Sequence, residues 1–85
     1  MASKDTFTGI ILQIIRETAE AKGVSLSHLG LDSPVDGSLG LDSLDWAAVV
    51  VRVELETGID PFAVGKTREL RTVSDLVDLY MTAAQ

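Results

Sequence analysis

The sequence contains no cysteine, and this absence excludes several kinds of chemistry. Without thiols the chain has no structural disulfide, no thiol nucleophile and no thiolate ligand for a metal. Histidine occurs once, as His28, so we expect no transition-metal site. A single loop histidine is also no basis for a Ser-His-Asp triad, and the sequence therefore predicts no autonomous enzyme.

Long apolar runs and an excess of basic residues are missing too. Apolar runs such as residues 49–51 are far too short to cross a bilayer. The N-terminus has no signal-peptide pattern, since Asp5 interrupts it and no long apolar region follows. The net charge of −6 disfavours nucleic acid, which needs a basic surface. We therefore expect a cytoplasmic protein that neither inserts into membranes nor binds nucleic acid.

The negative charge is concentrated in one segment. Residues 32–60 hold seven acidic side chains and one basic side chain, Arg52, whereas the rest of the chain is neutral. Such a surface attracts basic proteins, or it is a solvated face that keeps the protein soluble. A calcium-binding loop starting at Asp32 is not expected. Positions three and twelve of such a loop supply ligands, and here they are occupied by Pro34 and Ser43.

At 85 residues the chain is expected to form one domain, over residues 5–85, after a flexible segment 1–4. Apolar residues recur at helical spacing from about Asp5 to Lys22. A last helix is expected to begin at Thr72, which has Asp75 three residues later. No segment alternates with a period of two. The sequence thus predicts an all-α bundle of three main helices plus one short helix.

The second helix is expected at residues 43–57. Asp42 is a suitable N-cap, Asp45 completes a capping box, and Gly58 ends the helix. A long loop precedes this helix, and a short helical turn is expected between Phe62 and Leu70. Six apolar residues are available to anchor the loop: Val24, Leu26, Leu29, Leu31, Val35 and Leu39.

The second helix is apolar on most of its circumference, which is unusual for so small a domain. One row of apolar residues is formed by Ala47, Val50 and Val53 with Val49 beside them, and a second row by Leu44, Ala48, Val51 and Leu55. We expect the first row to pack in the core and part of the second to stay exposed as a binding surface. The alternative is that the long loop folds over the second row.

Ser43 is predicted to lie at the start of this helix, where the unpaired N–H groups favour a phosphate. Ser38 is a weaker candidate, because Gly40 follows closely and no helix is expected to begin there. Ser33 precedes Pro34 and is typical of a turn. Ser43 is therefore the serine most suited to covalent modification.

The segment Leu39-Gly40-Leu41 followed by Asp42-Ser43-Leu44 resembles the acyl carrier protein family, including its peptidyl-carrier relatives. The resemblance covers nearly the whole chain. It implies that Ser43 bears 4′-phosphopantetheine, donated by coenzyme A through a phosphopantetheinyl transferase that recognises Asp42. The arm's thiol would carry an acyl or an aminoacyl group as a thioester, and it would explain why the chain needs no cysteine.

The resemblance further implies that the second helix meets partner enzymes: the transferase, an acyl- or aminoacyl-loading ligase, and downstream transferases or synthases. The residues expected to guide docking are Leu44, Asp45, Trp46, Ala48, Val51 and Leu55. Ala48 and Leu55 replace acidic residues usual in fatty-acid-synthesis members, and Trp46 replaces a smaller one. These departures suggest a dedicated, stand-alone carrier in a specialised pathway. We also expect the protein to be a monomer. The alternative is an unmodified helical module that binds a partner helix through the same row.

Overall fold

The computed structural model describes residues 3–61 and 70–84. Within these ranges the chain forms α1 (Lys4–Ala21), a 3-10 turn, η1 (Gly37–Leu39), α2 (Ser43–Thr57) and α3 (Val73–Ala83). The only strand-like feature described there is an isolated antiparallel bridge between Pro34 and Thr72. The predicted all-α fold is confirmed. No helix in the described part of the chain is long and apolar enough to span a membrane.

Local capping signals determine where the helices begin. Ser3 caps α1, and its side chain accepts a hydrogen bond from the backbone N–H of Thr6 at 3.2 Å. Asp42 and Thr72 each form a complete capping box at the start of α2 and α3. Gly58, with φ of +73°, ends α2 in the left-handed conformation that glycine adopts without strain. The positions predicted for the second and third helices are therefore confirmed, and so are the capping residues predicted to start them.

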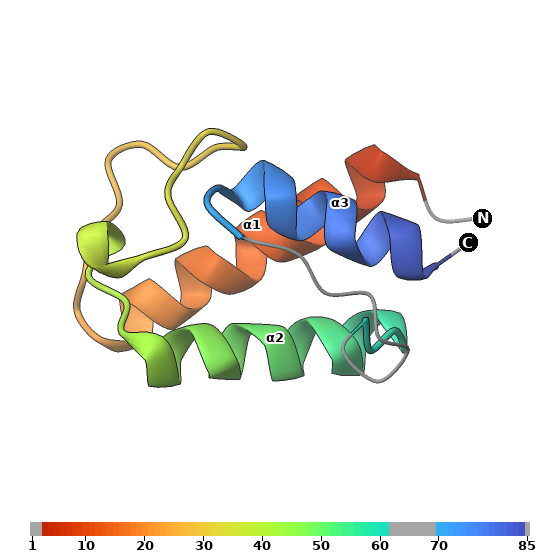
Figure 1. The fold of residues 1–85 in the computed structure, drawn as a ribbon. Coiled ribbons are helices and arrows are strands. Elements are labelled where there is room, and N and C mark those ends of the chain that lie inside the picture. Colours follow the sequence, from red (N-terminus) through yellow and green to blue (C-terminus); the bar gives the residue numbers. More distant parts are fainter. Residues whose placement is uncertain (1–2, 62–69, 85) are drawn as a thin grey trace.

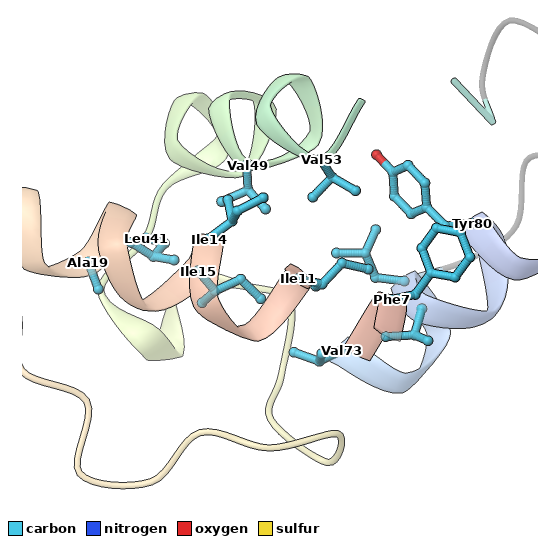
Figure 2. Close-up of a cluster of buried hydrophobic side chains, with 12 residues drawn as sticks. Phe7, Ile11, Ile14, Ile15, Ala19, Leu41, Val49, Val53, Val73 and Tyr80 are labelled. Atoms are coloured by element: carbon cyan, nitrogen blue, oxygen red, sulfur yellow. The ribbon is translucent and has the colours of Figure 1, made fainter. Parts of the chain in front are cut away.

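α1 is the central helix, because it packs against both α2 and α3 (Figure 1). Figure 2 shows Val49 and Val53 of α2 pointing towards Ile14 and Ile11 of α1, with Tyr80 of α3 beside Phe7. The buried cluster consists of Phe7, Ile11, Ile14, Ile15, Ala19, Leu41, Val49, Val53, Val73, Leu76, Val77 and Tyr80. Burying these apolar side chains is the main force that holds the three helices together.

The buried face of α2 differs from the predicted row at one residue. Val49 and Val53 are fully buried and Val50 is half-buried, as expected, but Ala47 is exposed. The buried face continues instead at Trp46, which is half-buried. Trp46 lies three residues before Val49 and four before Val50, so all three share one side of the helix. Ala47 is rotated by about 100° from Trp46 on the helix, which places it outside the buried face.

The long loop of residues 22–42 covers the end of the bundle where α2 and α3 begin (Figure 1). Its backbone is bonded to the start of α3: the N–H of Val35 donates to Arg71 O, and the N–H of Val73 donates to Ser33 O, both at 2.9 Å. Five of the six predicted anchors pack against the core; Leu31 is the exception and is exposed. The sequence reasoning missed Leu41, which is buried and fixes the end of the loop.

The loop also contains the 3-10 turn η1, where no helix was expected to begin. The side chain of Asp36 accepts a hydrogen bond from the N–H of Ser38 at 2.7 Å, and Gly40 ends the turn with φ of +79°. The expectation at Ser38 is therefore wrong, because a capping aspartate and a left-handed glycine suffice for one turn. The short turn predicted between Phe62 and Leu70 falls on residues 63–69, which lie outside the described residues.

Tyr80 is a buried side chain whose ionisation links stability to pH. Its hydroxyl donates to the carbonyl of Val50 at 3.3 Å. Burial, followed by the negative charges of Asp60 and Glu54, raises the pKa of Tyr80 to about 12. Because the raised pKa favours the neutral phenol, its contribution to stability is complete below the usual pKa of 10.0 and is lost as pH rises towards 12.

We therefore expect Tyr80→Phe to lower the free energy of unfolding at pH 8 by about 1 kcal/mol, the usual worth of one hydrogen bond. Between pH 10 and about 12 the wild type should lose stability faster than the variant. Denaturant unfolding followed by circular dichroism at several pH values measures both effects. Parallel pH dependences for the two proteins would contradict the assignment.

Candidate functional site

Ser43 is the first residue of α2, and its side chain is exposed. The N–H of Asp45 donates to the carboxylate of Asp42 at 2.9 Å, and the N–H of Asp42 donates to the carboxylate of Asp45 at 3.0 Å. This capping box fixes the backbone on both sides of Ser43. The Ser43 hydroxyl makes no hydrogen bond to another described residue, so nothing in residues 3–61 and 70–84 competes with its modification.

The side chain of Lys22, the residue that follows the last turn of α1, reaches the same turn. The ammonium of Lys22 donates to the carboxylate of Asp45 at 2.5 Å and to the carbonyl of Gly40 at 3.1 Å. The hydrogen bond from Lys22, together with the N–H of Asp42, holds the pKa of Asp45 below its ordinary value of 3.8. The same contact with Asp45 raises the pKa of Lys22. Both groups are therefore charged at neutral pH.

Sequence reasoning missed the role of Lys22, which it named only as the approximate end of the first helix. The two partners are 23 residues apart, and no local pattern joins them. The acidic segment itself was the available signal. Its carboxylates repel one another, and a basic side chain placed close to them by the fold reduces that repulsion.

Trp46 forms the wall of a shallow pocket beside Ser43. Its side chain is half-buried against the core, and its Nε1–H donates to the carbonyl of Asp36 at 3.2 Å. This bond joins α2 to the turn η1. The pocket has a volume of about 440 Å³ and is lined by Val35, Asp36, Gly37, Leu41, Asp42, Ser43, Trp46 and Leu70. An apolar surface with a carboxylate rim thus adjoins the exposed hydroxyl.

Because Trp46 contacts both the core and η1, its substitution should affect stability. We expect Trp46→Phe, which keeps an aromatic ring but loses the N–H donor, to lower the free energy of unfolding by about 0.5–1 kcal/mol. Trp46→Ala should cost more, since it also removes half-buried apolar surface. Denaturant unfolding followed by circular dichroism measures both. Equal stability of Trp46→Phe and the wild type would show that the bond to Asp36 contributes nothing.

The second apolar row of α2 is exposed along its length. Leu44 and Leu55 each retain 79% of their accessible surface, Val51 retains 54%, and Ala48 is also exposed. The alternative that the long loop folds over this row is therefore wrong, because the loop packs against the core and the start of α3 instead. Asp45, in contrast, is directed to Lys22 and to the capping box.

The competing candidates have ordinary structural roles. The Ser33 hydroxyl is buried and accepts a hydrogen bond from the N–H of Gly30 at 2.9 Å. His28 is exposed and lies 3.4 Å from the carboxylate of Asp32. No group of three or more potential metal ligands occurs in the ranges that the structure describes. The sequence also has three basic residues close together, Lys66, Arg68 and Arg71; only Arg71 lies within the described ranges, where it is exposed.

Known proteins resemble this chain over most of its length. A family model described as a phosphopantetheine attachment site matches residues 10–80. Two relatives, both named acyl carrier protein and from the Twist and TW08/27 strains of Tropheryma whipplei, are each 32% identical to the chain over 81 residues. The alignment covers 95% of this chain and 94% of each relative. No solved structure gives a significant match. Since the family model spans most of the sequence, the chain belongs to the phosphopantetheine-binding family of acyl carrier proteins.

Proposed function

We propose that Ser43 is the residue that carries the 4′-phosphopantetheine of this acyl carrier. The observation that carries the proposal is the exposed hydroxyl at the first position of α2, held by the capping box of Asp42 and Asp45 and without a competing hydrogen bond to another described residue. A helix N-terminus favours the negative charge of a phosphodiester. The pocket beside Trp46 leaves room next to the hydroxyl for the attached arm.

The modification is a phosphoryl transfer in which the chain is the substrate and a phosphopantetheinyl transferase is the catalyst. A bond forms between Ser43 Oγ and the phosphorus that bears pantetheine in coenzyme A. The bond between that phosphorus and the bridging oxygen of the pyrophosphate breaks, and adenosine 3′,5′-bisphosphate leaves. The hydroxyl proton passes to a base of the transferase. Asp42, which we propose as part of the transferase recognition site, is exposed next to Ser43.

The attached arm supplies a thiol that holds an acyl group as a thioester. The chain itself contributes presentation: α2 keeps the attachment point in one place, and tethering gives the cargo a high effective concentration at each partner's active site. We propose that the chain acts as a cytoplasmic monomer and that the exposed row of Leu44, Ala48, Val51 and Leu55 guides a loading ligase and downstream enzymes. Its apolar character supports a narrow set of partners in a specialised pathway.

The test is the intact mass of the purified chain after incubation with coenzyme A, Mg²⁺ and a phosphopantetheinyl transferase. We expect a gain of one phosphopantetheinyl group, which peptide mapping should locate on the peptide that contains Ser43. No gain in mass, with a transferase that modifies a known carrier in parallel, would favour an unmodified interaction module. A gain on another residue would refute the assignment of Ser43.

A further inference from the structure

Lys22 holds the two ends of the short segment that presents Ser43. Its ammonium donates to the carbonyl of Gly40, three residues before Ser43, and to the carboxylate of Asp45, two residues after it. Figure 1 shows that the end of α1 lies next to the start of α2. One side chain therefore joins a different helix to both sides of the attachment point.

Lys22 is itself in a fixed position. It is the C-cap of α1, and its backbone N–H is bonded to the carbonyls of Ala19 and Glu20. Ala19 is fully buried, so this end of α1 belongs to the core. A side chain that starts from a rigid helix end restricts whatever it binds more strongly than one from a mobile loop.

The segment between the two contacts is also held from within, because the capping box of Asp42 and Asp45 restrains its second half. Leu41 is buried and anchors it from the inside, and the N–H of Gly40 is bonded to Gly37 within the same loop. Lys22 adds the restraint from the outside. The Lys22–Asp45 pair is partly exposed, with side-chain exposures of 37% and 19%. Exposed pairs contribute little to global stability, so the main effect of this pair is local order.

From this geometry we infer that Lys22 is a positioning residue for the modification of Ser43. By fixing Gly40 and Asp45, Lys22 keeps the attachment segment in the conformation that the transferase accepts. The inference rests on the proposed function of Ser43. If the segment also adopts conformations that the enzyme does not bind, the apparent affinity falls in proportion to the fraction of molecules in the binding-competent conformation. The predicted signature is thus a change in the KM for the carrier rather than in kcat.

The test compares Lys22→Gln with Lys4→Gln in steady-state modification by a phosphopantetheinyl transferase at saturating coenzyme A. Both substitutions remove one positive charge, and Lys4 pairs with Asp78, away from the site, at 3.7 Å. We expect Lys22→Gln to raise KM about two- to fivefold with little change in kcat. Lys4→Gln should behave as the wild type, and Lys22→Arg should recover most of the loss because arginine supplies the same charge with more donors.

Two further measurements distinguish positioning from direct contact with the transferase and from a loss of global stability. If Lys22 acts through Asp45, the double variant Lys22→Gln/Asp45→Asn should be little worse than Asp45→Asn alone; additive effects would mean that Lys22 touches the transferase directly. Amide exchange in Lys22→Gln should quicken at Asp42 and Asp45 but not in α1 or α3. Uniformly faster exchange would mean a loss of global stability instead.

Unchanged KM in Lys22→Gln, or an equal rise in Lys4→Gln, would overturn this inference while leaving Ser43 as the attachment point. Failure of the wild type to be modified would overturn the proposed function itself. The two failures are therefore distinguishable in one set of reactions.

Discussion

Ser43→Ala is expected to abolish phosphopantetheinylation completely, because it removes the only atom of that side chain able to form the phosphodiester. The substitution should leave the fold intact. Ser43 is the exposed first residue of α2, and the capping box that starts this helix is made by Asp42 and Asp45. Alanine is also a good helix former. We expect the free energy of unfolding to change by less than about 0.5 kcal/mol.

The matched control is Ser38→Ala. Ser38 is an exposed serine of the turn η1, a few residues before the site, and it is followed by a leucine, as Ser43 is. Intact mass should show full modification of Ser38→Ala and none of Ser43→Ala, with equal helical circular dichroism for both. Modification of Ser43→Ala, or loss of modification in Ser38→Ala, would contradict the assignment.

The elements that local chemistry determines could be predicted from the sequence. The start and end of α2 follow from Asp42, Asp45 and Gly58. Asp42 and Gly58 flank the helix, and Asp45 lies in its first turn. The start of α3 follows in the same way from Thr72 and Asp75. These signals act over three residues and do not depend on the rest of the fold. The position of Ser43 at a helix N-terminus was predictable for the same reason.

The features that depend on distant contacts could not be predicted in this way. The loop binds the start of α3 through backbone groups of Val35 and Arg71, which carry no side-chain signal. The pairing of Lys22 with Asp45 requires the relative position of α1 and α2. Ala47 was wrongly assigned to the buried side because the predicted row used a constant spacing of three residues. Such a row gradually turns away from the core, whereas the buried face of a helix follows alternating spacings of three and four residues.

The exposure of Leu44 and Leu55 was predictable in part, from the amount of apolar surface that a small domain can cover. A helix that is apolar on most sides has more apolar surface than two neighbouring helices can bury. The structure shows which row is left over, and the 79% exposure of both leucines excludes cover by the loop. Exposed leucine and valine on consecutive turns form an apolar patch, a feature that generally marks a binding surface.

The double variant Leu44→Gln/Val51→Gln is expected to weaken docking of a phosphopantetheinyl transferase, with a rise of at least about tenfold in the KM for the carrier. Full burial of a leucine or valine side chain at an interface contributes about 1.5–3 kcal/mol, so partial burial of two is sufficient for this effect. Because both residues are exposed, stability should change by less than about 0.5 kcal/mol. Steady-state kinetics and denaturant unfolding measure the two quantities.

Leu31→Gln is the matched control, since Leu31 is an exposed leucine in the long loop, outside the row. It should leave the KM unchanged. Glutamine adds no charge, so the comparison isolates apolar contact from the acidic field around Ser43. Docking through this row should also persist at about 0.5 M salt, where charge attraction is strongly screened. A KM that rises steeply with salt, together with a normal KM for the double variant, would show that the acidic residues guide the partner instead.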